Sequence, residues 1–159
     1  MGRLKINYEK RFSAYPLKEE DLYEGMTFGY FENISQNITH LYIVLTEPEE
    51  HGGKVVVATA SVTSMSSSQL SGRKKKVDET VVLNKGDHPA ISHPSFVFYK
   101  RAKLWSVDEL LIYLNDEQAL CKDAMNEKVL EKIQYGLLSS DNTPEEVREF
   151  SEQYFYGSE

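Results

Sequence analysis

The segments His40–Thr46 (HLYIVLT) and Lys54–Thr63 (KVVVATASVT) decide the fold, and the polar turn Glu47–Gly53 separates them. Both segments are rich in β-branched residues, and the first is also aromatic, so we expect them to pair as an antiparallel hairpin. Shorter strands are expected at residues 25–31, 79–83 and 94–103. Strands of this length that follow one another without intervening helices predict a small antiparallel barrel or sandwich.

Helical patterns begin after residue 105. Ser106 is a suitable N-cap for a helix over Val107–Leu114. A longer helix is predicted over about residues 117–138, because apolar side chains recur there at spacings of four or five. Thr143 followed by Pro144 and two glutamates is typical of a third helix start, with Thr143 as the cap.

The charge distribution divides the chain at the same place. Residues 106–159 carry 13 acidic and 4 basic side chains, whereas residues 1–105 carry 12 acidic and 14 basic side chains. Such a division indicates two structural units with different surfaces. We therefore predict an α+β protein, in which residues 1–104 form a β-barrel domain and residues 105–159 form an acidic α-helical extension packed on or beside it.

Composition restricts the class of protein further. The single cysteine, Cys121, cannot form an internal disulfide and is interpreted as a small buried apolar residue. No apolar run follows Met1, and no segment reaches the roughly 18 apolar residues that a membrane span requires. The expectation is a cytoplasmic protein that has no membrane contact and needs no cofactor.

The connection Gly86–Pro94 (GDHPAISHP) between two predicted strands holds the strongest candidate chemistry, with Asp87, His88 and His93. Two imidazoles, with His40 as a third, could supply the base and the acid that phosphodiester cleavage needs. An ordinary turn would explain Asp87 and the prolines equally well, although it does not explain two histidines.

A metal site and a serine-hydrolase site are two further alternatives for this chain. A metal site at the same loop would normally show three or four ligands at a recognisable spacing, and neither a CxxC nor an HExxH pattern is present. A serine hydrolase would normally show a nucleophile elbow such as G-x-S-x-G, which is also absent. Neither a metal nor a serine nucleophile is therefore expected.

A nucleic-acid contact is suggested by the basic run Arg73, Lys74, Lys75 and Lys76, together with Arg101 and Lys103. The strand that holds Arg101 also carries aromatic residues, including Phe96 and Phe98. Basic side chains can contact phosphates while aromatic rings stack on bases. The alternative is that the basic run is only a solvated loop, since the chain as a whole is acidic, with a net charge of −7.

Residues 25–104 resemble the PemK/MazF class of toxins in the order of their segments. A glycine-led strand at Gly25 precedes the apolar strand 41–45, and a second strand, 55–58, runs on to Val62-Thr63-Ser64 before a long loop and a final strand. The threonine of the family's Ile-Thr-Ser-like motif matches Thr63, whereas His40 stands where the family typically has an arginine. The resemblance implies a small SH3-like barrel that forms a homodimer, cleaves RNA without a metal and is inhibited by an antitoxin.

The sequence therefore predicts a toxin-like RNA-binding protein that acts as a metal-independent endoribonuclease. In this hypothesis His40, His88 and His93 transfer protons, Asp87 orients a histidine, and Thr63 and Arg101 hold the phosphate. The 2′-hydroxyl would be the nucleophile, so DNA should not be cleaved. The alternative is a non-enzymatic protein-interaction module of the kind found in phages and mobile elements.

Overall fold

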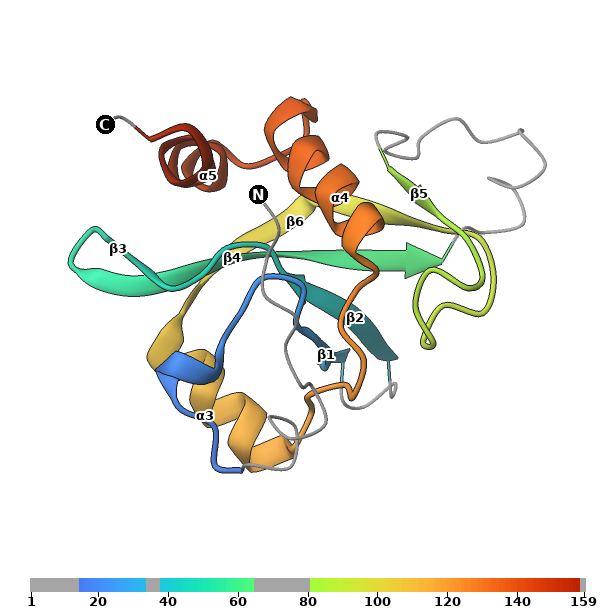
Figure 1. Ribbon diagram of the computed structural model, residues 1–159, viewed down its shortest axis with the longest axis horizontal. Helices are drawn as coiled ribbons and strands as arrows, with labels where there is room; N and C mark the ends of the chain where they lie inside the picture. Colours follow the sequence, from blue (N-terminus) through green and yellow to red (C-terminus); the bar gives the residue numbers. More distant parts are fainter. Residues whose placement is uncertain (1–14, 34–37, 65–80, 158–159) are drawn as a thin grey trace.

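The computed structural model describes residues 15–33, 38–64 and 81–157 (Figure 1). The described residues form an α+β structure, as the sequence predicts. Its elements are η1 (Glu19–Asp21), β1 (Thr27–Asn33), β2 (Ile38–Val44), β3 (Glu49–His51), β4 (Lys54–Ser64), β5 (Val82–Leu83), β6 (Ser95–Ser106), α3 (Val107–Glu117), α4 (Glu127–Ser139) and α5 (Glu145–Tyr156).

The strands form one antiparallel sheet in the order β1-β2-β4-β6-β5, and β3 pairs with β4 beside this path. The sheet is strongly curled and resembles half of a barrel (Figure 1). The predicted hairpin is confirmed, because β2 pairs with β4 from Leu41 opposite Val62 to Val44 opposite Thr59. The remaining predicted strands are present as β1, β5 and β6, with ends shifted by a few residues.

Alternate residues of β4 enter two separate cores, because successive side chains of a strand point to opposite faces. Val56, Ala58, Ala60 and Val62 enter a core that α4 and α5 complete with residues such as Ile133 and Phe150. Val57 enters the other core, which includes Leu110 and Leu114 of α3. We call these two sides of the sheet the α4–α5 face and the α3 face; Figure 1 shows α4 and α3 on opposite sides of β4.

The boundary predicted at residue 104 falls inside a continuous element. Strand β6 runs to Ser106 and leads directly into α3, where the Ser106 hydroxyl accepts a hydrogen bond from the Glu109 N–H as expected of a cap. The three C-terminal helices α3, α4 and α5 share both cores with the sheet. Their packing on the sheet, rather than a core of their own, therefore holds the acidic part of the chain in place.

The prediction of one long helix over 117–138 was wrong for residues 118–126. Helix α3 ends at Glu117, and Gln118 adopts a left-handed conformation with a φ of 48°. The chain then crosses back to β1, where Leu120 forms a β-bridge with Phe28. Helix α4 begins only after Asn126, whose side chain accepts hydrogen bonds from the N–H groups of residues 128 and 129.

The start of α5 also differs from the expected cap. Thr143 does not cap the helix, because its hydroxyl donates to the carbonyl of Leu137 at 2.7 Å, and Pro144 holds the cap position. Arg148 of α5 donates to the carbonyls of Leu138 and Ser140 at the end of α4, each at 2.5 Å. These bonds satisfy carbonyls that a helix end leaves open and fix α5 against α4. None of the helices in the described ranges has the length and hydrophobicity that crossing a membrane requires.

Candidate functional site

His88 is a buried structural residue. His88 is only 3% exposed to solvent. Its Nδ1 accepts a hydrogen bond from the N–H of Ala90 at 3.0 Å. An imidazole nitrogen that accepts has no proton, so the proton of the neutral ring lies on Nε2. Nε2 lies 2.8 Å from the Asp123 carbonyl and 3.0 Å from the Thr27 hydroxyl. With both nitrogens occupied inside the protein, His88 is not placed to transfer protons to a substrate, and that prediction is not supported.

Asp87 and His93 lie on either side of this anchor. The Asp87 carboxylate accepts the N–H of Asn84 at 2.8 Å, and the Asp87 N–H donates to the Asn84 carbonyl at 3.0 Å. These bonds close a turn, and none of the hydrogen bonds that hold the His88 ring comes from Asp87. The described contacts place Asp87 in this turn, and the prediction that it orients a histidine stays a prediction. His93 is exposed, and its Nδ1 lies 3.0 Å from the hydroxyl of the neighbouring Ser92.

His40 and Thr63 come together on the α3 face. His40 of β2 lies opposite Tyr30 of β1, and Thr63 of β4 lies opposite Phe96 of β6. The pairing of β2 with β4 ends at Leu41 opposite Val62, so His40 and Thr63 occupy the next positions on adjacent strands. Both are half-buried, and alternation places both on the side opposite to the aliphatic core of α4 and α5.

Arg101 and Lys103 lie over aromatic rings on the same face. The Arg101 guanidinium carbon is 5.5 Å from the centre of the Phe98 ring, and the Lys103 Nζ is 4.2 Å from the centre of the Trp105 ring. The Trp105 ring also meets Tyr30 edge to face, with centroids 5.3 Å apart. Both cations are exposed. We call this set of residues the sheet-face band: Tyr30, His40, Thr63, Phe98, Arg101, Lys103 and Trp105.

An irregularity in β6 assembles the band. Lys103 pairs with Thr59 and Phe98 pairs with Ser61, so five steps along β6 match two steps along β4. Thr59 and Ser61 point to the same face, and their partners therefore do so as well. A regular strand would have placed Phe98 and Lys103 on opposite faces. The bulge thus brings Arg101, Lys103 and the aromatic rings into one surface.

Among the described residues, three polar groups of this face lack hydrogen-bond partners. The Ser61 hydroxyl, the Thr63 hydroxyl and the Trp105 indole N–H are buried and make no hydrogen bond within the described part of the chain. Most buried polar groups in proteins are hydrogen-bonded, so exceptions require an explanation. Here they lie along β4 and β6 beside stacked rings and exposed cations. The face therefore combines hydrogen-bonding groups, aromatic surfaces and positive charge.

Three further predictions concern the basic run, a metal site and the cysteine. The basic run Arg73, Lys74, Lys75 and Lys76 lies outside the described residues. Among the residues that are described, no group of three or more His, Cys, Asp or Glu side chains converges as a metal site would require. Cys121 is partly buried, and burial raises the pKa of its thiol. It therefore lacks the lowered pKa of a reactive cysteine.

Sequence reasoning missed the roles of Tyr30 and Trp105. The available signal was the alternation of Arg101, Lys103 and Trp105 along one strand, which puts two cations and an indole on one side. No family model, curated protein or solved structure matches this chain. The site is therefore interpreted from its own geometry.

Proposed function

We propose that this protein binds single-stranded RNA on the α3 face of its sheet. The observation that carries the proposal is the pair of cation–aromatic contacts, Arg101 on Phe98 and Lys103 on Trp105. Surfaces that bind single strands combine aromatic platforms for bases with cations that follow the phosphates. On β6, the partly exposed ring of Phe98 supplies an aromatic platform, and the exposed Arg101 and Lys103 supply the cations.

The hydroxyl groups on this face favour RNA as the ligand. A 2′-hydroxyl is both a donor and an acceptor, and it distinguishes RNA from DNA at a given site. The hydroxyls of Ser61 and Thr63 have the same dual capacity, and because both oxygens are buried, RNA would reach them only after neighbouring side chains move. The curled antiparallel sheet is compatible with an SH3-like barrel of the toxin class, in which Thr63 would hold phosphate or ribose.

Metal-independent cleavage is the stricter form of the proposal. With His88 held inside the fold, proton transfer would depend on His40, which adjoins Thr63, and on the exposed His93. His93 precedes β6 by two residues, and the second residue of β6, Phe96, pairs with Thr63. One face at one end of the sheet would then carry both binding and cleavage.

The experiment is fluorescence anisotropy with a labelled oligouridine, in the presence of a chelator. The double variant Arg101→Gln/Lys103→Gln is expected to bind about tenfold more weakly, since it removes two cations that would pair with phosphates. It should also reduce the dependence of the binding constant on salt, because each lost phosphate contact releases one counterion fewer. The matched control is Lys128→Gln/Lys132→Gln on α4, which removes the same charge from exposed positions.

Equal losses in the two double variants, or no binding by the folded wild type, would contradict the proposed interface. Gel analysis of the same samples tests cleavage. RNA fragments that disappear in His40→Ala, with binding retained and an all-DNA analogue left intact, would establish the endoribonuclease. Intact RNA with normal binding would leave an RNA-binding protein without this activity.

The alternative interpretation, a protein-interaction module, is favoured by the burial of His88 in a hydrogen-bonded anchor. The partners implied by the toxin resemblance, an inhibitory antitoxin and a second copy of the chain, remain proposals. Light scattering of the purified protein with and without RNA tests for the homodimer.

A further inference from the structure

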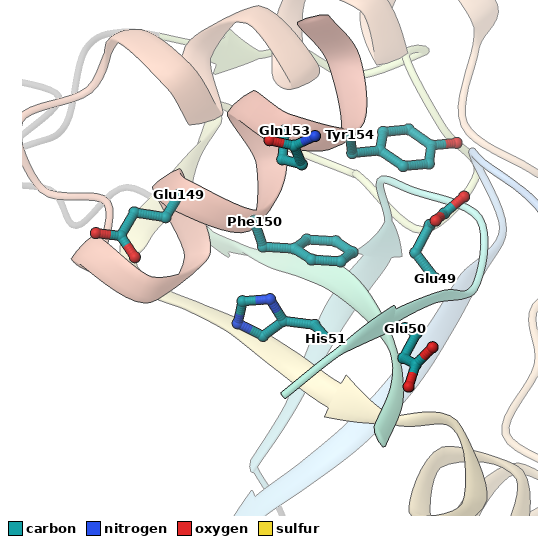
Figure 2. Close-up of a pocket in the computed structure, with 7 residues that line it drawn as sticks. All are labelled: Glu49, Glu50, His51, Glu149, Phe150, Gln153 and Tyr154. Atoms are coloured by element: carbon teal, nitrogen blue, oxygen red, sulfur yellow. The ribbon is translucent and has the colours of Figure 1, made fainter. Parts of the chain in front are cut away.

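A second surface lies between the β3 hairpin and α5, away from the sheet-face band. It is a pocket of about 480 Å³ (Figure 2). Strand β3 contributes Glu49, Glu50 and His51, while α5 contributes Glu149, Phe150 and Tyr154. The volume falls within the range of about 300–1,000 Å³ that is typical of sites for small molecules or side chains.

Aromatic rings form the inner wall of this pocket. Phe150 is only 4% exposed, and its ring meets the His51 ring edge to face at 5.4 Å and the Tyr154 ring in a stacked arrangement at 6.3 Å. Figure 2 shows Phe150 between His51 and Tyr154, with the three carboxylates placed around them. The pocket therefore presents π surfaces that attract cations.

The two sides of the pocket are fixed by bonds outside it. The Tyr154 hydroxyl donates to the Glu24 carboxylate and accepts the N–H of Glu47 at 3.0 Å, which ties α5 to the segment before β3. Gly52 and Gly53, with φ values of 62° and 84°, form the two-residue turn that folds β3 back on β4. The wall is thus largely preformed, so a ligand would not need to order it.

The charge of the pocket is negative. Glu49, Glu50 and Glu149 are exposed at its rim, and neither lysine nor arginine is among its described lining residues. A metal ion is a poor match, because no cluster of three ligating side chains converges in the described ranges. An organic cation of some length, which can lie against rings while it pairs with separated carboxylates, fits better.

We propose that this pocket binds a basic segment of a partner protein by accepting an arginine side chain. A guanidinium group stacks on aromatic rings and pairs with carboxylates through a planar array of donors. In the pocket it lies against Phe150 and Tyr154, and Glu49 and Glu149 neutralise its charge from opposite sides. The site uses the α4–α5 face, so its occupation is independent of RNA on the α3 face.

The test is anisotropy with a labelled peptide of alternating glycine and arginine. Glu49→Gln/Glu149→Gln is expected to weaken binding about tenfold, as the loss of two charge-assisted contacts implies. The control Glu131→Gln/Glu152→Gln removes the same charge from exposed helix positions that do not line the pocket, and it should change binding less than about twofold. In nuclear magnetic resonance spectra, peptide addition should shift the signals of His51 and Gln153.

Equal weakening in both double variants would mean that the peptide responds only to overall acidity, and it would overturn the site. Failure of the folded wild type to bind the peptide would overturn it as well. Equal binding of a glycine–lysine peptide would refute the assignment to arginine. These results do not depend on oligouridine binding, so the failure of one proposal can be distinguished from the failure of the other.

Discussion

Replacing His88 with alanine is expected to destabilise the fold and to leave RNA binding unchanged. His88 joins the loop before β6 to two distant segments, through Thr27 at the start of β1 and Asp123 before α4. The role that the sequence suggested for it, proton transfer, requires contact with a substrate. The two roles therefore predict opposite outcomes for the same variant.

The magnitude follows from the contacts of the ring. Three hydrogen bonds join it to Thr27, Asp123 and Ala90 at 2.8–3.0 Å. At about 1 kcal/mol each, their loss costs about 3 kcal/mol of the free energy of unfolding, before any cavity is counted. For a domain of this size that lowers the melting temperature by about 6–12 °C. His88→Gln can keep a donor near the Nε2 position, so it should lose about half as much.

The assay is urea denaturation followed by the fluorescence of Trp105, the single tryptophan of the chain, which is buried. RNA binding is then measured at about 10 °C, where the variants remain mostly folded. An unchanged urea midpoint in His88→Ala would refute the structural role. A folded His88→Gln protein that had lost RNA binding or cleavage would show that the histidine acts on the ligand.

Two further predictions concern α4 and α5. Gly136→Ala should lower the free energy of unfolding by about 2 kcal/mol, because a Cβ there would overlap the buried Tyr99 hydroxyl and lie 2.9 Å from Val81. Urea midpoints with and without Tyr99→Phe test this, and an equally stable single variant would contradict it. The pKa of Tyr154 is raised by burial and by the Glu24 carboxylate, so the folded state keeps a proton that the unfolded chain releases. Stability should therefore fall as the pH rises above about 10, the unfolded pKa. The stability of Tyr154→Phe should fall less over the same pH range, and identical profiles of stability against pH in the two proteins would exclude the effect.

Much of the fold could be predicted because its signals are local. The β-branched residues of the segment 54–63 predict the strand, and Ser106 caps α3 as its sequence suggests. The nine residues after Glu117 were predicted wrongly because their apolar spacing imitates a helix. A backbone bridge between Leu120 and Phe28, which are distant in sequence, ends that pattern. The cap residue Asn126 was a local signal that could have placed the start of α4.

The candidate site was less accessible to sequence reasoning, because it depends on contacts between distant residues. The partner of His88 at Asp123 is 35 residues away, and nothing near His88 in sequence indicates that its ring is enclosed. The position of Lys103 on the same face as Phe98 results from the bulge opposite Thr59 and Ser61. Regular alternation along β6 would instead place Lys103 and Phe98 on opposite faces of the sheet. The sequence therefore indicates the chemistry of these residues, but only the pairing of β4 with β6 shows which of them lie together.

The acidic net charge of −7 is spread over both faces of the sheet. Of the 13 acidic side chains in residues 106–159, four lie on α3, on the same face as Arg101 and Lys103, and six lie on α4 and α5, which pack on the opposite face. Packed layers lie about 10 Å apart, and the Debye length at physiological ionic strength is about 8 Å. Much of the repulsion from the carboxylates of α4 and α5 is therefore screened before it reaches RNA on the α3 face. The same separation leaves the pocket beside α5 negative enough to attract a basic partner, so one small sheet can present surfaces for ligands of opposite charge.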